Sequence, residues 1–348
     1  MQVSRAKATR MWDSLVYLDK HRARVRVRER SISLQRYALI TGSAKGLAVV
    51  FAHHLAKQHY DLILNYRQSR AACETLAETL RKAYGIHVSV IQADMTQPAD
   101  IEGMLDHVLR DTPRLDAVIH SAGPFIFSRK RLTDYDPSEW RQMIDGNLTS
   151  AFHVFRRVLP LMRRQGYGRI VTVGFDRVEE APGWPYRAAY AAAKVGLASL
   201  TRSIAMEERE CGITANMICP GDIRGAAKEQ DVDLDALDAP ANAPIAGDLA
   251  QIIDLLLDPR AKLLTGNVVS LTGGIDVISK FDSGKIDVRD AIVYEPGGVV
   301  YVIPWQRNAT ILRRDDHPNR RSIYTVQSGN ERGAFTYEQF QGAISDGV

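Results

Sequence analysis

Short apolar runs and longer amphipathic stretches alternate along the middle of the chain. Seven runs of four to six apolar residues, each bounded by a longer helical pattern, occur between Tyr37 and Gly274. Such an alternation predicts a doubly wound α/β Rossmann fold, a parallel sheet covered on both faces in three αβα layers. The predicted strands lie at 37–40, 61–66, 88–94, 116–123, 169–174, 214–221 and 268–274, and the predicted helices at 47–58, 69–84, 98–111, 137–164, 187–211 and 246–257.

The pattern changes on either side of this region. After Gly274, apolar runs at 291–294, 299–303 and 322–326 are separated by Pro, Gly and Asn, which predicts a small β-rich appendage ending in a short helix near 336–344. We therefore expect three parts, which are a basic N-terminal arm (1–35), a Rossmann domain (36–280) and the appendage (281–348).

The positive net charge of +4 belongs to the arm. Residues 1–36 carry ten Lys or Arg and three Asp or Glu, and arginines alternate at 22, 24, 26, 28 and 30. The arm could contact an anionic partner. We favour a solvated extension outside the fold, because no aromatic or groove-reading module accompanies the charge. We accordingly expect no nucleic-acid partner.

Other features of the sequence narrow the class of protein. No apolar run approaches the roughly 18 residues that would cross a membrane, and the N-terminus lacks the apolar segment of a secretory signal. Cys73, Cys211 and Cys219 are odd in number and lack metal-ligand spacing. They are typical of reduced thiols, so we expect a cytoplasmic protein without a metal site and without a membrane partner.

A glycine-containing loop joins the first predicted strand to the first predicted helix. In Thr41-Gly-Ser-Ala-Lys-Gly-Leu47, Gly42 and Gly46 would let the backbone turn tightly and approach a pyrophosphate. The following helix N-terminus supplies unpaired N–H groups and a positive dipole end for that charge. We expect this loop to bind a dinucleotide through Gly42, Ser43, Lys45, Gly46 and Leu47.

The end of the second predicted strand indicates which dinucleotide is bound. An acidic residue there would hold the 2′-hydroxyl of NAD, but this chain has Asn65-Tyr66-Arg67. Arg67 and Lys45 favour the 2′-phosphate of NADP, unless they are only surface charges. Asp94, followed by Met95, ends the third strand and is placed to accept a hydrogen bond from the adenine amine.

Tyr190 and Lys194 lie one helical turn apart in Tyr190-Ala-Ala-Ala-Lys194. Reduction of a carbonyl by hydride requires a proton for the oxygen, and a free tyrosine, with a pKa of about 10, is a poor acid near neutrality. A lysine cation one turn away, together with a positive nicotinamide, would lower that pKa. The spacing gains its weight from its position after the fifth predicted strand.

Taken together, these motifs resemble the short-chain dehydrogenase/reductase family over roughly residues 36–280. The matching positions are Thr41, Gly42, Gly46, Asp94, Ser121, Ala122, Gly123, Asn147, Tyr190, Lys194, Pro220, Gly221, Gly273 and Gly274. The resemblance implies that Tyr190 is the proton donor, that Lys194 holds the nicotinamide ribose, and that Asn147 orders Lys194 through water. It also implies that Ser121–Gly123 and Pro220-Gly221, with Ile223, line the cofactor site, and that the protein is a dimer or tetramer.

Two positions depart from the family pattern. The family has a serine about thirteen residues before the tyrosine to hydrogen-bond the substrate carbonyl, whereas this chain has Phe175-Asp176 there and no hydroxyl residue between Gly174 and Pro185. His120 replaces an asparagine. Loss of the serine admits a non-catalytic, NADP-binding regulatory module. The joint presence of Asn147, Tyr190 and Lys194 favours an enzyme.

The segment after the fifth strand suggests a substrate. It carries the carboxylates Asp176, Glu179 and Glu180, which would repel anionic thioesters and attract an amine, unless they are merely solvated. The ring of Trp184 follows them and would be available for the cation of the amine. Glu180-Ala-Pro-Gly-Trp184, together with Tyr186-Arg187 and Cys219-Pro-Gly-Asp-Ile223, resembles a bacterial subgroup, the elongation factor P 5-aminopentanone reductases. That resemblance implies NADPH-dependent reduction of a ketone on a lysine of elongation factor P to 5-aminopentanol. The alternative is a 3-oxoacyl-thioester reductase acting on acyl carrier protein or CoA substrates.

Overall fold

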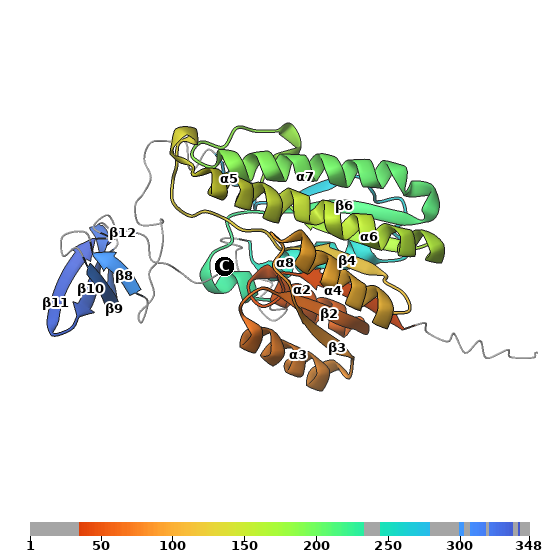
Figure 1. Ribbon diagram of the computed structural model, residues 1–348, viewed down its shortest axis with the longest axis horizontal. Helices are drawn as coiled ribbons and strands as arrows, with labels where there is room; N and C mark the ends of the chain where they lie inside the picture. Colours follow the sequence, from red (N-terminus) through yellow and green to blue (C-terminus); the bar gives the residue numbers. More distant parts are fainter. Residues whose placement is uncertain are drawn as a thin grey trace, which may run out of the picture. The chain divides into compact units, whose positions relative to one another are not determined.

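The computed structural model describes residues 35–232, 244–278, 299–302, 307–317, 320–336 and 340–341, so the basic arm up to residue 34 lies outside the described residues. The predicted Rossmann fold is confirmed, because a seven-stranded sheet runs in the order β3-β2-β1-β4-β5-β6-β7 with every neighbouring pair parallel. Figure 1 shows this sheet among its helices, with β2, β3, β4 and β6 labelled. Its strands are β1 (Arg36–Thr41), β2 (Tyr60–Tyr66), β3 (Val88–Gln92), β4 (Ala117–His120), β5 (Gly168–Val173), β6 (Ile213–Pro220) and β7 (Val268–Leu271).

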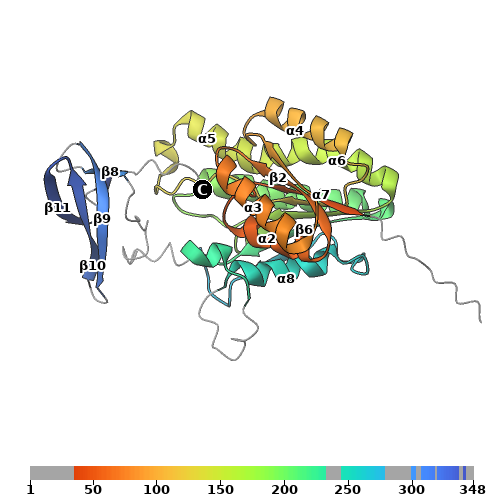
Figure 2. The ribbon, with the colours of Figure 1, turned by 90° about the horizontal axis from the view of Figure 1, so that it is seen from below.

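Helices cover both faces of this sheet (Figure 2). One face packs against α2, α3 and α8, and the other against α4, α6 and α7. The helices span α2 (Leu47–Lys57), α3 (Arg70–Tyr84), α4 (Pro98–Asp111), α5 (Pro137–Ile144), α6 (Ser150–Gln165), α7 (Ala188–Glu207) and α8 (Ala246–Leu257).

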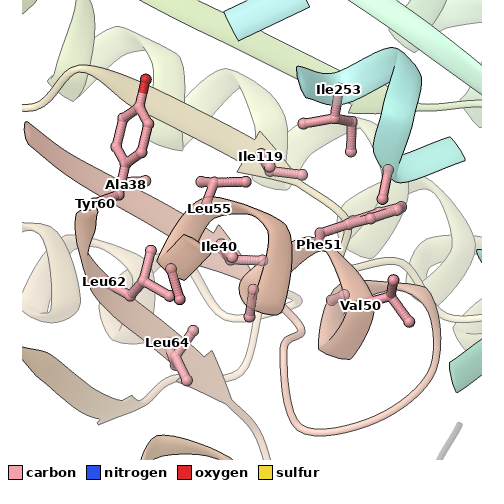
Figure 3. Close-up of a cluster of buried hydrophobic side chains, with 14 of the residues drawn as sticks. Ala38, Ile40, Val50, Phe51, Leu55, Tyr60, Leu62, Leu64, Ile119 and Ile253 are labelled. Atoms are coloured by element: carbon pink, nitrogen blue, oxygen red, sulfur yellow. The ribbon is translucent and has the colours of Figure 1, made fainter. Parts of the chain in front are cut away.

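The central strand β1 shows why the sheet is buried on both sides. Ala38 and Ile40 point into the core formed with α2 and α8, where Phe51 and Ile253 also lie (Figure 3). Leu39, between them in the sequence, points into the opposite core. Because successive strand residues face opposite sides, a strand covered on both faces must be apolar at every position.

The long helix predicted at 137–164 is interrupted. Between α5 and α6 the chain makes a π-helical turn, Asp145–Thr149, which contains Asn147. The hydroxyl of Ser150 donates to the carbonyl of Gly146 at 2.8 Å. A π turn adds a residue to the helical repeat without breaking the helix, and such turns often occur at functional sites. Apolar periodicity alone did not predict it.

A second, antiparallel sheet confirms the β-rich C-terminal appendage. Its strand order is β11-β10-β9-β8-β12, but the short helix predicted near 336–344 is wrong at the described residues. Thr336 ends a strand paired with β10, and Phe340–Gln341 pair with β8, so cross-strand hydrogen bonding overrides the local helical pattern. The predicted run at 291–294 lies outside the described residues. The strands are β8 (Val299–Val302), β9 (Arg307–His317), β10 (Arg320–Ser328), β11 (Glu331–Thr336) and β12 (Phe340–Gln341).

Among the described residues, no helix combines the length and the apolar character needed to span a bilayer.

His120 ties three elements together at the end of β4. It is fully buried, with Nδ1 3.1 Å from the Thr41 hydroxyl of β1 and Nε2 3.1 Å from the Ser150 hydroxyl of α6. Since Ser150 donates to a carbonyl, it must accept from Nε2–H, and Nδ1 accepts from Thr41. Burial, followed by the nearby Lys194 cation, lowers the pKa of His120 to about 3. His120 is therefore uncharged and links β1, β4 and α6 through its hydrogen bonds.

This burial predicts an acid-sensitive fold. The folded-state pKa lies below the unfolded value of about 6.5, so the unfolded chain gains a proton as the pH falls through 6.5 and the folded chain does not. The free energy of unfolding should fall by about 2 kcal/mol between pH 7 and pH 5 from this residue alone. Urea titrations at both pH values should show a smaller loss for His120→Asn. Ring signals of His120 that titrate near pH 6.5 in the NMR spectrum of the folded protein would contradict the prediction.

Candidate active site

The candidate site lies at the carboxyl edge of the parallel sheet. The strand order places β1 beside β4, with the sheet growing toward β3 on one side and toward β7 on the other. At such a switch point the loops after the two strands diverge and leave a crevice, where α/β proteins bind their ligands. The loop after β1, the segment after β4 and the ends of β5 and β6 all meet there.

The loop after β1 packs closely on the segment after β4, which explains Gly42. This residue has φ +67°, and a Cβ on it would lie only 2.8 Å from the Cα of Ala122. The buried Asn65 side chain accepts the Gly42 N–H at 3.0 Å, and the Ser43 hydroxyl donates to the Asn65 carbonyl at 3.0 Å. Asn65 therefore shapes the loop from the end of β2.

Gly46, also at positive φ, presents its N–H to an anion. The Glu229 carboxylate accepts that N–H at 2.7 Å, and a Cβ on Gly46 would meet nothing within 4 Å. The carboxylate oxygen stands in for a phosphate oxygen, next to the N-terminus of α2, which begins at Leu47. These residues fit the pyrophosphate of a dinucleotide.

The predicted nucleotide-selecting residues lie around the ends of β2 and β3. Arg67 directly follows β2, and Lys45 is exposed in the glycine-containing loop. Asp94 follows β3, and its Oδ1 accepts the N–H and the hydroxyl of Thr96, both at 2.8 Å. Met95 is buried beside it. The Oδ1 atom of Asp94 therefore stabilises the turn that follows β3, through its hydrogen bonds to Thr96.

Tyr190 and Lys194 project from the first turns of α7. The Lys194 ammonium donates to the Val173 carbonyl of β5 at 2.8 Å and lies 5.8 Å from the centre of the Tyr190 ring. Burial lowers the pKa of Lys194 to about 8 and raises the pKa of Tyr190 above its ordinary value. The direction for Tyr190 is opposite to the expected lowering, because burial disfavours the charged phenolate in the protein alone.

Asn147 lies against this pair from the π turn. Its side chain is fully buried, and its amide nitrogen donates to the carbonyls of Pro124 and Met143, at 2.9 and 3.0 Å. Among the described residues, its Oδ1 has no hydrogen-bond partner. A Cβ on Gly123 would lie 2.3 Å from that oxygen and 3.3 Å from the Lys194 nitrogen, so Gly123, Asn147 and Lys194 meet at one point.

Aromatic rings surround Tyr190 where the family's serine is absent. The ring centres of Phe125, Phe175 and Trp184 lie 4.9, 6.0 and 6.0 Å from that of Tyr190. Phe175, which occupies the expected place of the serine, also packs on Trp184 at 5.0 Å. The wall beside the phenol is therefore apolar.

Arg187 is a component of the site to which the sequence analysis assigned no role. Its guanidinium donates to the carbonyls of Phe127 and Ser128, at 2.6 and 2.5 Å, and lies 5.0 Å above the Phe125 ring. Burial lowers its pKa to about 10. Because the Arg187 carbonyl accepts the Ala191 N–H, Arg187 joins the start of α7 to the loop that carries Phe125. No spacing rule marks such a contact.

The end of β6 forms the floor of the site. Cys219 is buried, and a Cβ on Gly174 would lie 2.8 Å from its sulfur. Burial raises the pKa of the Cys219 thiol. Gly221 donates its N–H to the Leu271 carbonyl at 2.8 Å, and a Cβ there would come within 2.9 Å of that oxygen. Pro220 and the buried Ile223 flank it.

The four predicted substrate residues do not share one surface. Asp176 is buried and accepts the Val277 N–H at 3.2 Å, whereas Glu179 and Glu180 are exposed and Trp184 packs inward on Phe175. Next to Trp184, an open apolar pocket of about 620 Å³ is lined by Ala181, Pro182, Gly183, Trp184, Pro185, Ala188, Ala191, Ala192 and Val195. Across the described residues, no group of three His, Cys, Asp or Glu could hold a metal ion.

A family profile described as enoyl-(acyl carrier protein) reductase matches residues 42–276, more than half of the chain. The chain belongs to the short-chain dehydrogenase/reductase family. It is therefore an oxidoreductase of a family whose members bind NAD or NADP. The matched range contains Tyr190, Lys194, Asn147 and the glycine-containing loop.

Named relatives cover the same part of the chain. YtkK of Bacillus subtilis (strain 168), which is named as an oxidoreductase, is 42% identical over 251 residues, 70% of this chain and 98% of YtkK. The 3-oxoacyl-[acyl-carrier-protein] reductase FabG of Staphylococcus aureus (strain Mu50 / ATCC 700699) is 30% identical over 249 residues, 70% of this chain and 99% of FabG.

A solved structure from Bacillus thuringiensis, named as a 3-oxoacyl-reductase, superposes with a TM-score of 0.65 at 40% identity. It covers 70% of this chain and 99% of the other. Levodione reductase superposes with a TM-score of 0.60 at 26% identity, over 69% and 96% of the two chains.

The lowered pKa of Lys194 predicts an alkaline limit to nucleotide use. An ordinary lysine stays charged to about pH 10, whereas Lys194 should lose its cation above about pH 8. Because kcat/KM for the nucleotide reports groups of the free enzyme, it should fall above that pH. In Lys194→Arg the residual activity should keep its value to higher pH, since arginine does not deprotonate there. An alkaline limb at the same pH in both proteins would show that another group titrates.

Proposed function

We propose that this protein is an NADPH-dependent carbonyl reductase in which Tyr190, Lys194 and Asn147 form the proton relay. The proposal rests on one observation. Tyr190, Lys194 and the side-chain oxygen of Asn147, which has no hydrogen-bond partner among the described residues, lie close together near the glycine-containing loop. A bound reduced nicotinamide supplies the hydride that goes to the carbonyl carbon. The residues of the chain then have to supply one proton to the carbonyl oxygen.

Tyr190 fits the role of proton donor. Its phenol is protonated at neutral pH, so that it can hydrogen-bond to a carbonyl oxygen. Burial alone raises its pKa and opposes transfer of that proton, and the positive charge of a bound oxidised nicotinamide would lower the pKa again. Lys194, held by the Val173 carbonyl, places a positive charge near the phenolate that this transfer leaves. The Asn147 oxygen can accept a hydrogen bond from a water that re-protonates the pair.

The absence of the serine changes how the substrate oxygen is held. With Phe175 in that place, the Tyr190 hydroxyl is the donor that we assign to the carbonyl. The rings of Phe125, Phe175 and Trp184 would exclude water around it, which strengthens a hydrogen bond made there. The retained Tyr190, Lys194 and Asn147 favour this reading over a regulatory module.

Selection of NADPH rests on charge. Arg67 follows β2, where an acidic residue would favour NAD, and its guanidinium can pair with a 2′-phosphate. Lys45 adds a second cation, and Asp94 keeps one oxygen for the adenine amine. Gly42, Ser43, Gly46 and Leu47 would hold the pyrophosphate, and Ser121–Gly123, Pro220, Gly221 and Ile223 would enclose the ribose and nicotinamide.

We expect Arg67→Ala to raise KM for NADPH about tenfold and to leave KM for NADH nearly unchanged. A charge-assisted hydrogen bond to phosphate contributes about 1.5 kcal/mol or more, which corresponds to that factor. Initial rates with both nucleotides provide the measurement. Arg70→Ala serves as a matched control, because Arg70 is exposed on the adjacent helix and faces Glu74. Equal losses for NADPH and NADH would refute selection by Arg67.

For the substrate we propose the 5-aminopentanone group on a lysine of elongation factor P, which reduction would convert to 5-aminopentanol. The exposed Glu179 and Glu180 can attract its ammonium, and the aromatic rings near Tyr190 can bind a cation. Asp176 has a different role in this account, because its carboxylate holds the Val277 N–H. Trp184 serves as part of the aromatic wall. We further expect a cytoplasmic dimer or tetramer.

A second candidate is the reduction of 3-oxoacyl thioesters carried by acyl carrier protein or CoA. Two observations favour it. The FabG relative and the Bacillus thuringiensis structure carry names of that activity. The pocket beside Trp184 is apolar and has no carboxylate among its lining residues, so an acyl chain could lie in it.

The deciding experiment measures the intact mass of elongation factor P from cells that lack the gene, complemented with wild type or with Tyr190→Phe. Reduction adds one hydride and one proton, so only the wild type should increase the mass of the modified factor by two hydrogens, about 2 Da. The phenyl ring keeps the packing and removes the proton.

The same purified proteins are assayed with acetoacetyl thioesters and NADPH. Equal masses in all samples, together with thioester reduction that Tyr190→Phe abolishes, would replace the first candidate by the second. Activity of neither kind, with NADPH still bound, would favour the regulatory module.

A further inference from the structure

The segment 225–232 contacts α2 and the glycine-containing loop that precedes it. It follows β6 and begins with the short helix Gly225–Glu229, which packs against α2 and α8. Ala227 contacts the core beneath, and the Gln230 carbonyl accepts the Gly247 N–H of α8 at 2.9 Å. The segment is therefore docked on the face of the domain that carries the glycine-containing loop.

Two carboxylates of this segment contact α2 and its entry loop. Glu229 accepts the Gly46 N–H at 2.7 Å, and Asp231 lies 3.0 Å from Nε2 of His54. The other ring nitrogen of His54 is 2.7 Å from Asp254 of α8. Both ring nitrogens face carboxylates, which a charged imidazole satisfies best, and the hydrogen bond to Asp254 is the largest cause of the raised pKa of His54.

Gly247 allows the segment to approach α8 closely. A Cβ on Gly247 would lie 2.4 Å from the backbone nitrogen of Val232 and 2.7 Å from the Asp231 carboxylate. The segment thus has attachments at Gly247 and His54 that do not involve Glu229. These attachments hold Glu229 near Gly46 and raise its local concentration there.

The Gly46 N–H can donate a hydrogen bond to only one strong anionic partner at a time. It points from a positive-φ turn at the N-terminus of α2, and the same group belongs to the loop that fits a dinucleotide pyrophosphate. A carboxylate and a phosphate oxygen at that position would also repel each other. Glu229 therefore occupies part of the surface that the cofactor requires.

We propose that Glu229 is an internal competitor for the pyrophosphate site and that this competition sets the affinity of the protein for its nicotinamide dinucleotide. Binding of the dinucleotide exchanges the Gly46 N–H from the Glu229 carboxylate to a phosphate oxygen. Asp231, Gln230 and Gly247 keep the segment docked during the exchange. The inference rests on the proposed dinucleotide site and is independent of the ketone substrate.

The test separates the contact from the charge of Glu229. Glu229→Asp keeps the negative charge but shortens the side chain by one methylene, so that it no longer reaches Gly46. Glu229→Ala removes both contact and charge. Dissociation constants for NADPH, and for 2′-phospho-ADP-ribose as a probe without the nicotinamide, are measured by calorimetry in the absence of any ketone.

Both variants should bind the two probes about three- to tenfold more tightly than wild type, the range that loss of one competing hydrogen bond produces. Amide hydrogen exchange at Gly46, measured without nucleotide, should become faster in both. Glu210→Ala is the control, because Glu210 is 90% exposed on the short helix Arg209–Cys211 before β6 and carries the same charge. It should change neither quantity.

Two results would overturn the proposal. Tighter binding in Glu229→Ala with wild-type binding in Glu229→Asp would show a general effect of charge. Unchanged Gly46 exchange in both variants would show that the contact does not exist in solution. Failure of the proposed function looks different, because a protein that binds neither NADPH nor NADH would still show the exchange difference at Gly46 if Glu229 contacts it.

Discussion

The candidate site is organised around a buried lysine ammonium. Removing such a charge from water is costly, and the lowered pKa of Lys194 reflects that cost. The protein offsets it with the Val173 carbonyl at the end of β5 and brings the Asn147 oxygen close by. The π turn, the absence of a side chain at Gly123 and the burial of α7 against the sheet all serve this arrangement. Tyr190 lies one helical turn before Lys194, so the same packing buries its ring beside the ammonium.

Much of this architecture could be predicted from the sequence. Alternating apolar runs determine a parallel sheet because each central strand must be apolar on both faces, as Ala38, Leu39 and Ile40 show. Gly42 and Tyr190 were found because turn geometry and one-turn spacing are local properties. The roles assigned to these residues remain proposals, although the family is shown.

The rest depended on contacts between residues distant in the chain. Arg187 reaches carbonyls about 60 positions earlier, and Asp176 turns toward Val277 about 100 positions later. Nothing local distinguishes an arginine that binds carbonyls from one in solvent, or a buried carboxylate from an exposed one. The C-terminal helix was predicted wrongly for the same reason, since strand pairing of Phe340 with Val302 decides the local structure.

The substitutions around Tyr190 are mutually consistent. In polar surroundings, Phe175 in place of the serine would leave neighbouring polar groups without a hydrogen-bond partner. Its neighbours here are the rings of Trp184 and Tyr190, and Phe125 packs on the other side of Tyr190. His120 also fits its surroundings, because its two ring nitrogens hydrogen-bond to Thr41 of β1 and to Ser150 of α6. The asparagine of the family pattern has a shorter side chain with which to make both contacts. The site is thus a packed variant of the family arrangement.

The rate at which the thiol of Cys219 is alkylated can report local opening of the domain. The thiol is buried in the core that also contains residues of α7, and burial holds its pKa so high that almost no thiolate exists at neutral pH. Alkylating reagents react with the thiolate, and they need physical access. Cys211, which is partly exposed, should be modified quickly, whereas modification of Cys219 has to wait until β5, β6 and α7 separate. Its labelling rate therefore records how often the floor of the site opens.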